Sequence, residues 1–118
     1  MKILFIIIPV ILIIIKLLTS KPDIDGVRAR ELMKNGCRII DVRSQSEYRK
    51  GHIKNSINIP LNDILVDIGK HEIKKDTCVI LYCASGARSE SAKRFLKNEG
   101  YSNIYNGGSL RHMMRLEG

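Results

Sequence analysis

Two parts with different patterns of hydrophobic positions make up the 118-residue chain. Residues 3–18 are apolar throughout except for Lys16, and Pro9 is the only interruption of this run. Such a stretch is typical of a membrane anchor or a signal segment. As a helix it measures about 24 Å at ~1.5 Å per residue, which is slightly less than the roughly 30 Å hydrocarbon core of a bilayer. We therefore assign residues 1–20 to an N-terminal membrane anchor or signal segment and residues 21–118 to a separate domain.

The N-terminal segment has two interpretations, an uncleaved anchor or a cleaved signal peptide. Lys2 provides the positive start that a signal peptide needs, but residues 18–22 contain no A-x-A-like cleavage site, which favours the anchor. Basic residues flank the apolar run on both sides, so their distribution does not decide the orientation. We predict a membrane-anchored or exported protein that contacts the membrane through residues 3–18, with the periplasmic or extracytoplasmic side favoured.

The rest of the chain alternates between short apolar runs and helical patterns. Residues 77–82 form the strongest predicted strand, because residues 78–81 are continuously apolar, as in strands that are covered on both faces. This alternation with short links indicates one α/β domain with a mostly parallel central sheet and helices on both faces. Strands are predicted at residues 38–42, 57–59, 77–82 and 102–105, helices at residues 27–35, 46–50, 61–68, 89–98 and 110–116, and a turn at residues 107–108.

The chain is basic, with 20 Lys and Arg against 12 Asp and Glu and a formal net charge of +8. Two of the basic residues lie in the apolar segment, which leaves 18 against 12, or about +6, in residues 21–118. This excess suits anionic small molecules or an anionic membrane surface. The basic residues are scattered and have no interleaved aromatic residues, so we predict no nucleic-acid partner. No C-x-x-C or H-x-x-x-H spacing occurs, and neither a metal nor a cofactor is predicted.

Three cysteines occur, Cys37, Cys78 and Cys83. In an extended run Cys78 and Cys83 lie about 16 Å apart at ~3.3 Å per residue, whereas a disulfide needs Cα atoms within about 7 Å. That pair is not expected to bridge, and the odd count leaves at least one free thiol. An exported domain makes a disulfide worth considering. Otherwise we expect Cys37 and Cys78 to be buried small hydrophobic residues.

Cys83 ends the strongest predicted strand, and the next helix is predicted to begin near Ser89. In an open α/β sheet, ligands bind beyond the carboxyl ends of the strands. Residues 84–88 therefore lie between a strand end and a helix N-terminus, where successive backbone N–H groups form an anion-binding nest. The same field favours a thiolate and lowers the pKa of the cysteine, which makes it a nucleophile.

The side chains of this loop fit that interpretation. They are too small to cover the sulfur, and they let backbone N–H groups approach it. Gly86 allows a backbone conformation that a Cβ atom would resist, and Arg88 adds a fixed positive charge with a fork that suits an oxyanion. The interpretation requires that the Cys83 side chain is not enclosed in the protein and that the neighbouring amides point toward its sulfur.

Several motifs resemble those of the rhodanese sulfurtransferases. Residues 83–89, Cys-Ala-Ser-Gly-Ala-Arg-Ser, resemble the active-site loop pattern C-x-x-G-x-R-[ST]. The resemblance covers about residues 24–116 and implies a single-domain rhodanese fold. The chain departs from the family after residues 107–108, where many members carry a tryptophan that this sequence lacks. Further similar motifs are Ile40-Asp41-Val42-Arg43, Glu47-Tyr48, Gly51-His52-Ile53, Asn58-Ile59-Pro60, Gly100-Tyr101 and Asn106-Gly107-Gly108.

The resemblance also implies a two-step reaction without a cofactor. Cys83 takes the outer sulfur of a donor such as thiosulfate, becomes a persulfide, and passes that sulfur to a thiol or to cyanide. Arg88 positions the sulfonate of the donor, and no histidine base is needed if the loop holds the thiolate. A protein persulfide is a further possible partner. Cys83 is thus the predicted catalytic residue, and the predicted substrate-binding residues are Ala84, Ser85, Gly86, Ala87, Arg88 and Ser89.

Other matched residues are expected to support the loop. Asp41 ends a strand and is expected to brace the loop, and Arg43 and Glu47, four residues apart, are expected to pair with each other. For both Asp41 and Arg43 a structural role is favoured over catalysis. His52 and Tyr82 are expected to serve in hydrogen bonding and packing.

Two rival functions stay open. A phosphatase or arsenate reductase also uses a cysteine-arginine loop, but such loops commonly place five residues between the two, and Cys83 and Arg88 are separated by four. A shorter loop makes a smaller cradle, which fits an added sulfur atom better than a tetrahedral phosphate. The other rival is a non-enzymatic rhodanese-like module that relays sulfur or binds a partner; inert modules usually lack the cysteine that is present here.

Overall fold

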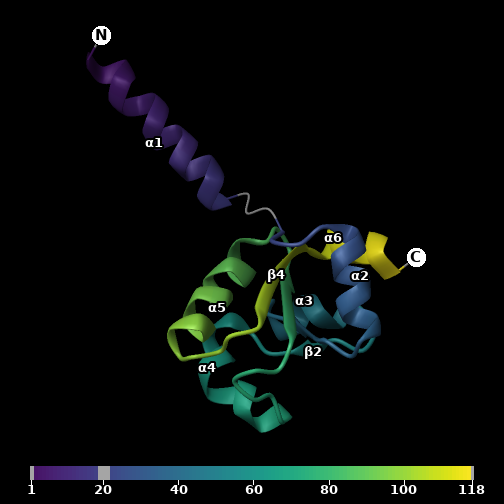
Figure 1. Cartoon of the computed structure of the whole chain (residues 1–118). Coiled ribbons are helices and arrows are strands. Elements are labelled where there is room, and N and C mark those ends of the chain that lie inside the picture. The colour runs from purple at the N-terminus through teal and green to yellow at the C-terminus, as the bar shows by residue number, and fades with distance from the viewer. Residues whose placement is uncertain (1, 19–21, 118) are drawn as a thin grey trace.

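The computed structural model describes residues 2–18 and 22–117. Helix α1 (Lys2–Leu18) extends away from the remainder of the chain (Figure 1), and its large apolar side chains between Ile3 and Ile15 are exposed. It has 17 residues. Within the described residues, no helix combines the length and the apolar character that crossing a membrane requires. The predicted membrane span at residues 3–18 is therefore not supported.

A four-stranded, all-parallel sheet forms the centre of the domain. It consists of β1 (Arg38–Asp41), β2 (Ile57–Asn58), β3 (Val79–Cys83) and β4 (Ile104–Ser109), in the spatial order β2-β1-β3-β4. Asp41 lies opposite Tyr82, and Cys83 lies opposite Ser109. The carboxyl ends of β1, β3 and β4 therefore meet at one edge of the sheet, as predicted for a parallel α/β fold.

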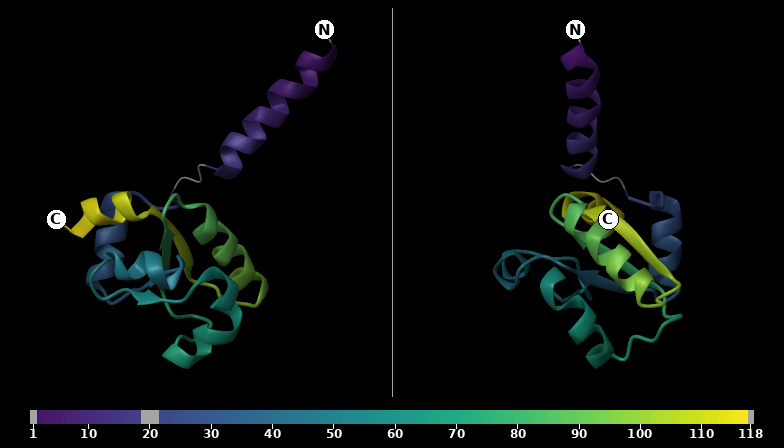
Figure 2. Two further views of the ribbon diagram at one scale, coloured as in Figure 1. Left: turned by 180° about the vertical axis from the view of Figure 1, so that it is seen from behind. Right: turned by 90° about the vertical axis from the view of Figure 1, so that its left-hand side faces the viewer.

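Helices cover both faces of the sheet, which confirms the predicted α/β architecture (Figures 1 and 2). Helices α2 and α6 pack on one face, and α4 and α5 pack on the other. The short helix α3 connects β1 to β2. The bounds are α2 (Gly26–Lys34), α3 (Gln45–Arg49), α4 (Ile64–Asp67), α5 (Ala87–Asn98) and α6 (Leu110–Glu117), and two 3-10 turns, η1 (Leu61–Asp63) and η2 (Ile68–His71), flank α4.

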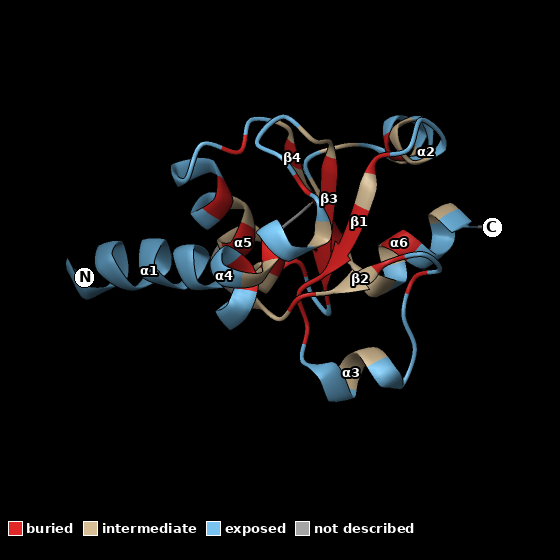
Figure 3. Ribbon diagram, turned by 90° about the horizontal axis from the view of Figure 1, so that it is seen from below, coloured by how far each residue is buried: buried red, intermediate tan, exposed pale blue. Residues whose placement is uncertain are grey.

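Alternate residues of β3 divide the core into two parts, because successive side chains of a strand point to opposite faces. Val79, Leu81 and Cys83 pack with α4 and α5, whereas Ile80 and Tyr82 pack with α2 and α6. All five residues are buried, and Figure 3 shows the central strands buried beneath largely exposed helices. Cys83 is thus the last residue of a strand that is covered on both faces.

Several element boundaries differ from the predictions, and three of the differences change the local structure. The pattern at residues 61–68 forms η1, α4 and η2 instead of one helix. Strand β4 continues to Ser109, so the predicted turn at residues 107–108 is wrong. A Cβ atom on Gly107 would lie 2.7 Å from Met113 Sδ, so this glycine lets α6 pack closely on β4. Helix α5 begins at Ala87 and not at Ser89, which places Ser89 in its first turn.

A disulfide joins Cys37 to Cys78, with Cα atoms 4.8 Å apart and a sequence separation of 41. The expectation that both are unbridged small hydrophobic residues is therefore wrong. The parallel pairing of β1 with β3 aligns Arg38 with Val79, which brings the two preceding residues side by side. Cys83 is left as a free thiol, in agreement with the predicted lack of a Cys78–Cys83 bridge. The disulfide lies at the amino ends of the strands, opposite the Cys83 edge.

Candidate active site

The chain turns sharply after Cys83, the last residue of β3. Gly86 has φ 94°, a left-handed backbone conformation that glycine adopts without the strain of a Cβ atom. Helix α5 then begins at Ala87, only four residues beyond Cys83. Its first turn therefore faces the carboxyl end of β3, which is the arrangement of strand end and helix N-terminus that favours an anion.

Three donors are directed at the Cys83 sulfur. The backbone N–H of Gly86 lies 3.0 Å from Sγ, and the backbone N–H and the hydroxyl of Ser89 each lie 3.5 Å from it. The expected nest of amides is therefore present, although the helix contributes part of it. In the described part of the chain, no hydrogen bond joins Ala84, Ala87 or Arg88 to the sulfur. Their roles in substrate binding stay predictions.

The thiol of Cys83 has a lowered pKa. Burial raises the pKa, but hydrogen bonds from the Ser89 hydroxyl and from the backbone N–H groups of Ser89, Ser85 and Gly86 outweigh that effect. The hydroxyl has a single proton, and Asn106 Oδ1, at 2.7 Å, is its nearest acceptor. The amides are consequently the donors that remain available to the sulfur in every hydroxyl orientation.

Asn106, which is fully buried in β4, holds the loop in place. Its Nδ2 donates to the carbonyl of Gly86 at 3.1 Å and to Glu90 Oε2 at 2.9 Å. Its Oδ1 accepts from the Ser89 hydroxyl and from the N–H of Gly108. Sequence reasoning did not assign Asn106 to the site. A polar residue within a buried strand pattern is the signal that points to it.

Cys83 has no exposed surface. The expectation that small neighbours leave the sulfur uncovered is therefore wrong. Of the two requirements of the nucleophile interpretation, an open Cys83 side chain is not met in this structure, whereas amides directed at the sulfur are present. The reason lies in the pleat of β3, which directs Cys83 into the same core as Leu81, Ala92 and Leu96. A substrate reaches the sulfur only when surrounding atoms move.

Arg88 and Glu47 form an ion pair across 41 residues of sequence. Arg88 Nη1 lies 2.7 Å from Glu47 Oε1, and Nη2 lies 2.9 Å from Oε2, so both ends of the carboxylate are held. The pair lowers the pKa of Glu47 to about 2. The pKa of Arg88 is raised, first by its hydrogen bonds to Glu47, and its charge also interacts with Cys83. The spacing suggested an ion pair between Arg43 and Glu47, but Glu47 pairs with Arg88 instead.

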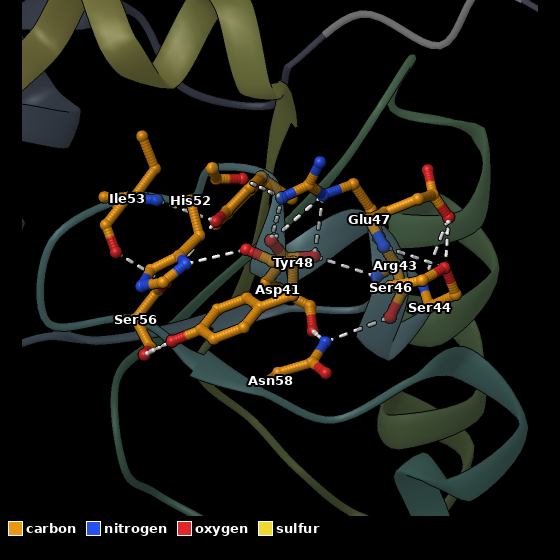
Figure 4. Close-up of polar contacts among 12 residues, drawn as sticks. Asp41, Arg43, Ser44, Ser46, Glu47, Tyr48, His52, Ile53, Ser56 and Asn58 are labelled. Carbon is orange, nitrogen blue, oxygen red and sulfur yellow. Dashed lines mark hydrogen bonds and ion pairs between the residues drawn. The ribbon is translucent and has the colours of Figure 1, made fainter.

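Arg43 pairs instead with Asp41 at the end of β1 (Figure 4). Its Nε and Nη2 donate to the Asp41 carboxylate at 2.7 to 3.0 Å, and Nη2 also donates to the carbonyl of Gly51 at 2.7 Å. Asn58 Nδ2 bonds the carbonyls of both Asp41 and Arg43. None of the Asp41 hydrogen bonds in the described residues reaches the loop at 84–88, so Asp41 organises the segment that leads to α3.

His52 and Tyr82 make structural contacts, as expected. The ring of His52 stacks on Tyr48 with a centroid distance of 3.6 Å, and its Nδ1 lies 2.8 Å from the carbonyl of Tyr48 (Figure 4). The Tyr82 hydroxyl accepts from the N–H of Ile53 at 3.0 Å. Burial raises the pKa of Tyr82 to about 12, so it stays protonated at neutral pH.

Within the residues that the structure describes, no three His, Cys, Asp or Glu side chains gather in a way that suits a metal ion. A cavity of about 940 Å³ lies at the amino edge of the sheet and is lined by Arg30, Cys37, Arg38 and Lys54 among others. Cys83 does not line it.

Comparison with known proteins agrees with this geometry. Residues 27–109 match the family model described as the rhodanese-like domain. The chain belongs to the rhodanese family. Among related rhodanese structures, the E. coli rhodanese with anions has a TM-score of 0.61 and 35% identity, and the match covers 64% of this chain and 88% of that one. The human single-domain sulfurtransferase TSTD1, at 23% identity and a TM-score of 0.69 over 81% of this chain and 97% of its own, shares the fold.

Rhodanese relatives in bacteria carry two different names. Thiosulfate sulfurtransferase PspE of Escherichia coli K12 is 36% identical over 72 residues, which cover 61% of this chain and 69% of PspE. A tRNA uridine(34) hydroxylase of Buchnera aphidicola is 34% identical over 83 residues, which cover 64% of this chain and 26% of the hydroxylase. The chain thus spans between about a quarter and about two thirds of these relatives.

Proposed function

We propose that this rhodanese domain is a sulfurtransferase that carries a sulfane sulfur as a persulfide on Cys83. The observation that carries the proposal is the convergence of the backbone N–H groups of Gly86 and Ser89 on one sulfur atom, with the Ser89 hydroxyl 3.5 Å from it. Donors in this position stabilise an anionic sulfur, and the pKa of the thiol is lowered accordingly. The relatives named sulfurtransferases support the same class of reaction.

The proposed reaction has two balanced steps. In the first, the Cys83 thiolate attacks the outer sulfur of thiosulfate, a new S–S bond forms, the bond between that sulfur and the sulfonate breaks, and sulfite leaves with the electron pair. The product is the anionic persulfide Cys83–S–S⁻. In the second, cyanide or a thiolate attacks the terminal sulfur, and the electron pair of the broken bond returns to Cys83.

The surrounding groups have distinct parts in this proposal. The N–H groups of Gly86 and Ser89 hold the negative sulfur before and after the transfer, so no histidine base is required. Arg88, whose charge interacts with Cys83, attracts the sulfonate of the donor. The turn of four residues between Cys83 and Arg88 makes a small cradle, which favours an added sulfur over the tetrahedral phosphate of a phosphatase or the arsenate of a reductase.

Access to the buried sulfur is the critical requirement of the proposal. The purified chain is incubated with thiosulfate and examined by intact-protein and peptide mass spectrometry. A sulfur adduct of about 32 Da on Cys83 that cyanide removes as thiocyanate is the expected result, and the Cys83→Ser variant is the control. Alkylation of Cys83 by iodoacetamide in the folded protein tests access independently. If Cys83 gains no sulfur adduct and is not alkylated, the assignment as an enzyme is wrong.

A second candidate is a non-enzymatic module that relays sulfur or binds a partner protein. The complete burial of Cys83 favours it, because a partner that opens the site upon docking would limit transfer to its own persulfide. Donor profiling separates the two functions. An enzyme acting on small molecules accepts sulfur from thiosulfate or a small organic persulfide, whereas a relay accepts it only from a persulfidated protein.

We also propose that the domain works in an oxidising compartment on the extracytoplasmic side. The Cys37–Cys78 disulfide supports this location, since such bonds persist in exported proteins and are rare in the cytosol. Trapping thiols with a maleimide in intact cells and lysates, without a reductant, tests it. Only Cys83 should react. Labelling of all three cysteines in rapidly quenched cells would contradict the location.

A further inference from the structure

The guanidinium of Arg88 is held in one orientation by Glu47. The two contacts at 2.7 and 2.9 Å run from the two Nη atoms to the two carboxylate oxygens, which is an end-on fork. Glu47 is itself fixed on α3, where its Oε1 accepts from the backbone N–H of Ser44 at 3.1 Å and from its hydroxyl at 2.9 Å. The Ser44–Glu47 contacts form a capping box (Figure 4).

This geometry leaves donors of Arg88 unused. A guanidinium has five N–H groups, and the end-on fork engages one on each Nη atom, so the Nε–H and one N–H on each Nη remain. No other hydrogen bond of the Arg88 side chain occurs in the part of the chain that the structure describes. The Arg88 side chain is 38% exposed, so part of it faces solvent. Arg88 directly precedes Ser89, whose backbone N–H lies 3.5 Å from the Cys83 sulfur, so Arg88 belongs to the same turn around the thiol.

We propose that Glu47 is a positioning residue that presents the free edge of Arg88 as a preformed oxyanion site beside Cys83. The inference rests on the proposed sulfurtransferase function and adds a specificity to it, namely donors that carry a sulfonate or a similar oxyanion. Glu47 touches neither the sulfur nor the donor. It acts through Arg88, which it keeps from adopting solvent-directed rotamers.

Two effects of Glu47 oppose each other, and their sizes decide the outcome. Its negative charge repels an anionic donor, but the pair is more than one third exposed, so screening reduces this effect to about two- or threefold in affinity. A free arginine must be ordered when the anion binds, which costs on the order of tenfold in affinity for a rotamer-rich side chain. Orientation therefore outweighs repulsion, and loss of Glu47 should weaken donor binding.

The experiment compares Glu47→Ala with Glu47→Gln, which keeps the shape and one acceptor oxygen. We expect Glu47→Ala to raise the KM for thiosulfate about three- to tenfold with little change in kcat, and Glu47→Gln to have a smaller effect. Glu31→Ala, which breaks an exposed pair with Arg28 on α2, is the matched control for loss of an acid. If both Glu47 variants lower the KM equally, Glu47 acts through its charge alone and the proposal is wrong.

A double-mutant cycle separates positioning from helix capping. In an Arg88→Lys background, which lacks the fork, removal of Glu47 should raise the KM no further. If removal of Glu47 raises the KM by the same factor in both backgrounds, Glu47 only caps α3 and the proposal is wrong.

Two readouts do not depend on sulfur transfer. Alkylation of Cys83 by iodoacetate, an anion, should fall relative to alkylation by neutral iodoacetamide in Glu47→Ala. The Nη–H resonance of Arg88, identified by its loss in Arg88→Lys, should be protected from exchange in the original chain, where both Nη atoms donate to Glu47, and lost in Glu47→Ala. An unchanged alkylation ratio together with an unchanged resonance would refute the role of Glu47 even if no donor transfers sulfur. Conversely, if the alkylation ratio and the resonance change in Glu47→Ala but no donor transfers sulfur, the positioning role of Glu47 is supported and only the proposed reaction is rejected.

Discussion

The backbone N–H of Gly86 lies 3.0 Å from the sulfur of Cys83, and the left-handed conformation of Gly86, with φ 94°, directs it there. A backbone donor does not rotate about a side-chain bond, unlike the hydroxyl of Ser89, so it stays directed at the sulfur as long as the turn keeps this conformation. The conformation of one residue thus determines much of the electrostatic environment of the thiol. Four predictions follow from this and from related contacts.

Replacement of Gly86 should damage both stability and thiol acidity. Gly86→Ala forces a Cβ atom into a left-handed conformation, which costs about 1–2 kcal/mol, and the relaxed loop should withdraw the N–H and raise the pKa of Cys83. Urea denaturation and the pH dependence of iodoacetamide alkylation measure the two effects. Gly69→Ala is the control, since Gly69 has open space around it and no positive φ. Equal changes in both variants would count against the proposed role of Gly86.

The thiol of Cys83 should make the folded state more stable as the pH rises. Its pKa is lower in the folded protein than in the unfolded chain, where it is about 8.5. Between these values the unfolded chain binds more protons, so stability increases with pH. The contribution is fully present above the unfolded pKa and is lost as the pH falls through the folded pKa. Denaturation curves of the original chain and of Cys83→Ser between about pH 5 and 9.5 test this. If the stability of the original chain relative to Cys83→Ser decreases with rising pH, burial has raised the pKa of Cys83 and the prediction is wrong.

Asn106 should be essential to the geometry of the loop. Asn106→Ala removes a fully buried amide and leaves the carbonyl of Gly86, the N–H of Gly108 and the Ser89 hydroxyl without that partner. The expected cost is about 2–4 kcal/mol in the free energy of unfolding. The pKa of Cys83 should rise as well, because Gly86 and Ser89 lose their support.

Substitution of Asn98, which is exposed at the end of α5, is the matched control for Asn106. Asn98→Ala should change the free energy of unfolding by no more than ~0.5 kcal/mol. If Asn106→Ala destabilises the fold but leaves the alkylation profile unchanged, Asn106 supports packing alone and not the thiolate.

Removal of the disulfide should lower stability without altering the Cys83 loop. In the chain-entropy description, a bridge across 41 residues restricts the unfolded chain by about 4 kcal/mol, so the Cys37→Ala, Cys78→Ala double variant should lose about 3–4 kcal/mol. Cys83 lies at the other end of β3, so its alkylation rate should stay within about twofold of the original at a temperature where both proteins are folded. A large change in that rate would indicate coupling along the strand.

Local pattern was sufficient to predict the architecture. The continuous apolar run before Cys83 marked the central strand, and its abrupt end beside small residues marked the edge where the amides of Gly86 and Ser89 now meet the sulfur. These features depend on residues close together in sequence. The carboxyl ends of parallel strands then define the site without further information.

Long-range pairings were not predictable from the same pattern. The Cys37–Cys78 bridge requires the register of β1 against β3, and the Arg88–Glu47 pair requires the position of α3 relative to α5. Neither is encoded in spacing, which instead suggested an Arg43–Glu47 pair one helical turn apart. The burial of Cys83 was missed for a related reason, since the size of neighbours in sequence says little about neighbours in space.

Two sulfur atoms mark the ends of β3: Cys78, which directly precedes the strand, is in a disulfide, and Cys83, its last residue, is a free thiol. Cys78 and Cys83 are five positions apart in extended chain, about 16 Å at ~3.3 Å per residue, and a hydrogen-bonded strand cannot fold back to join them. The extended strand therefore keeps the free thiol of Cys83 too far from the disulfide for the two to react with each other. Under the proposed function, the outer sulfur of a persulfide on Cys83 could not exchange with the Cys37–Cys78 disulfide of the same chain.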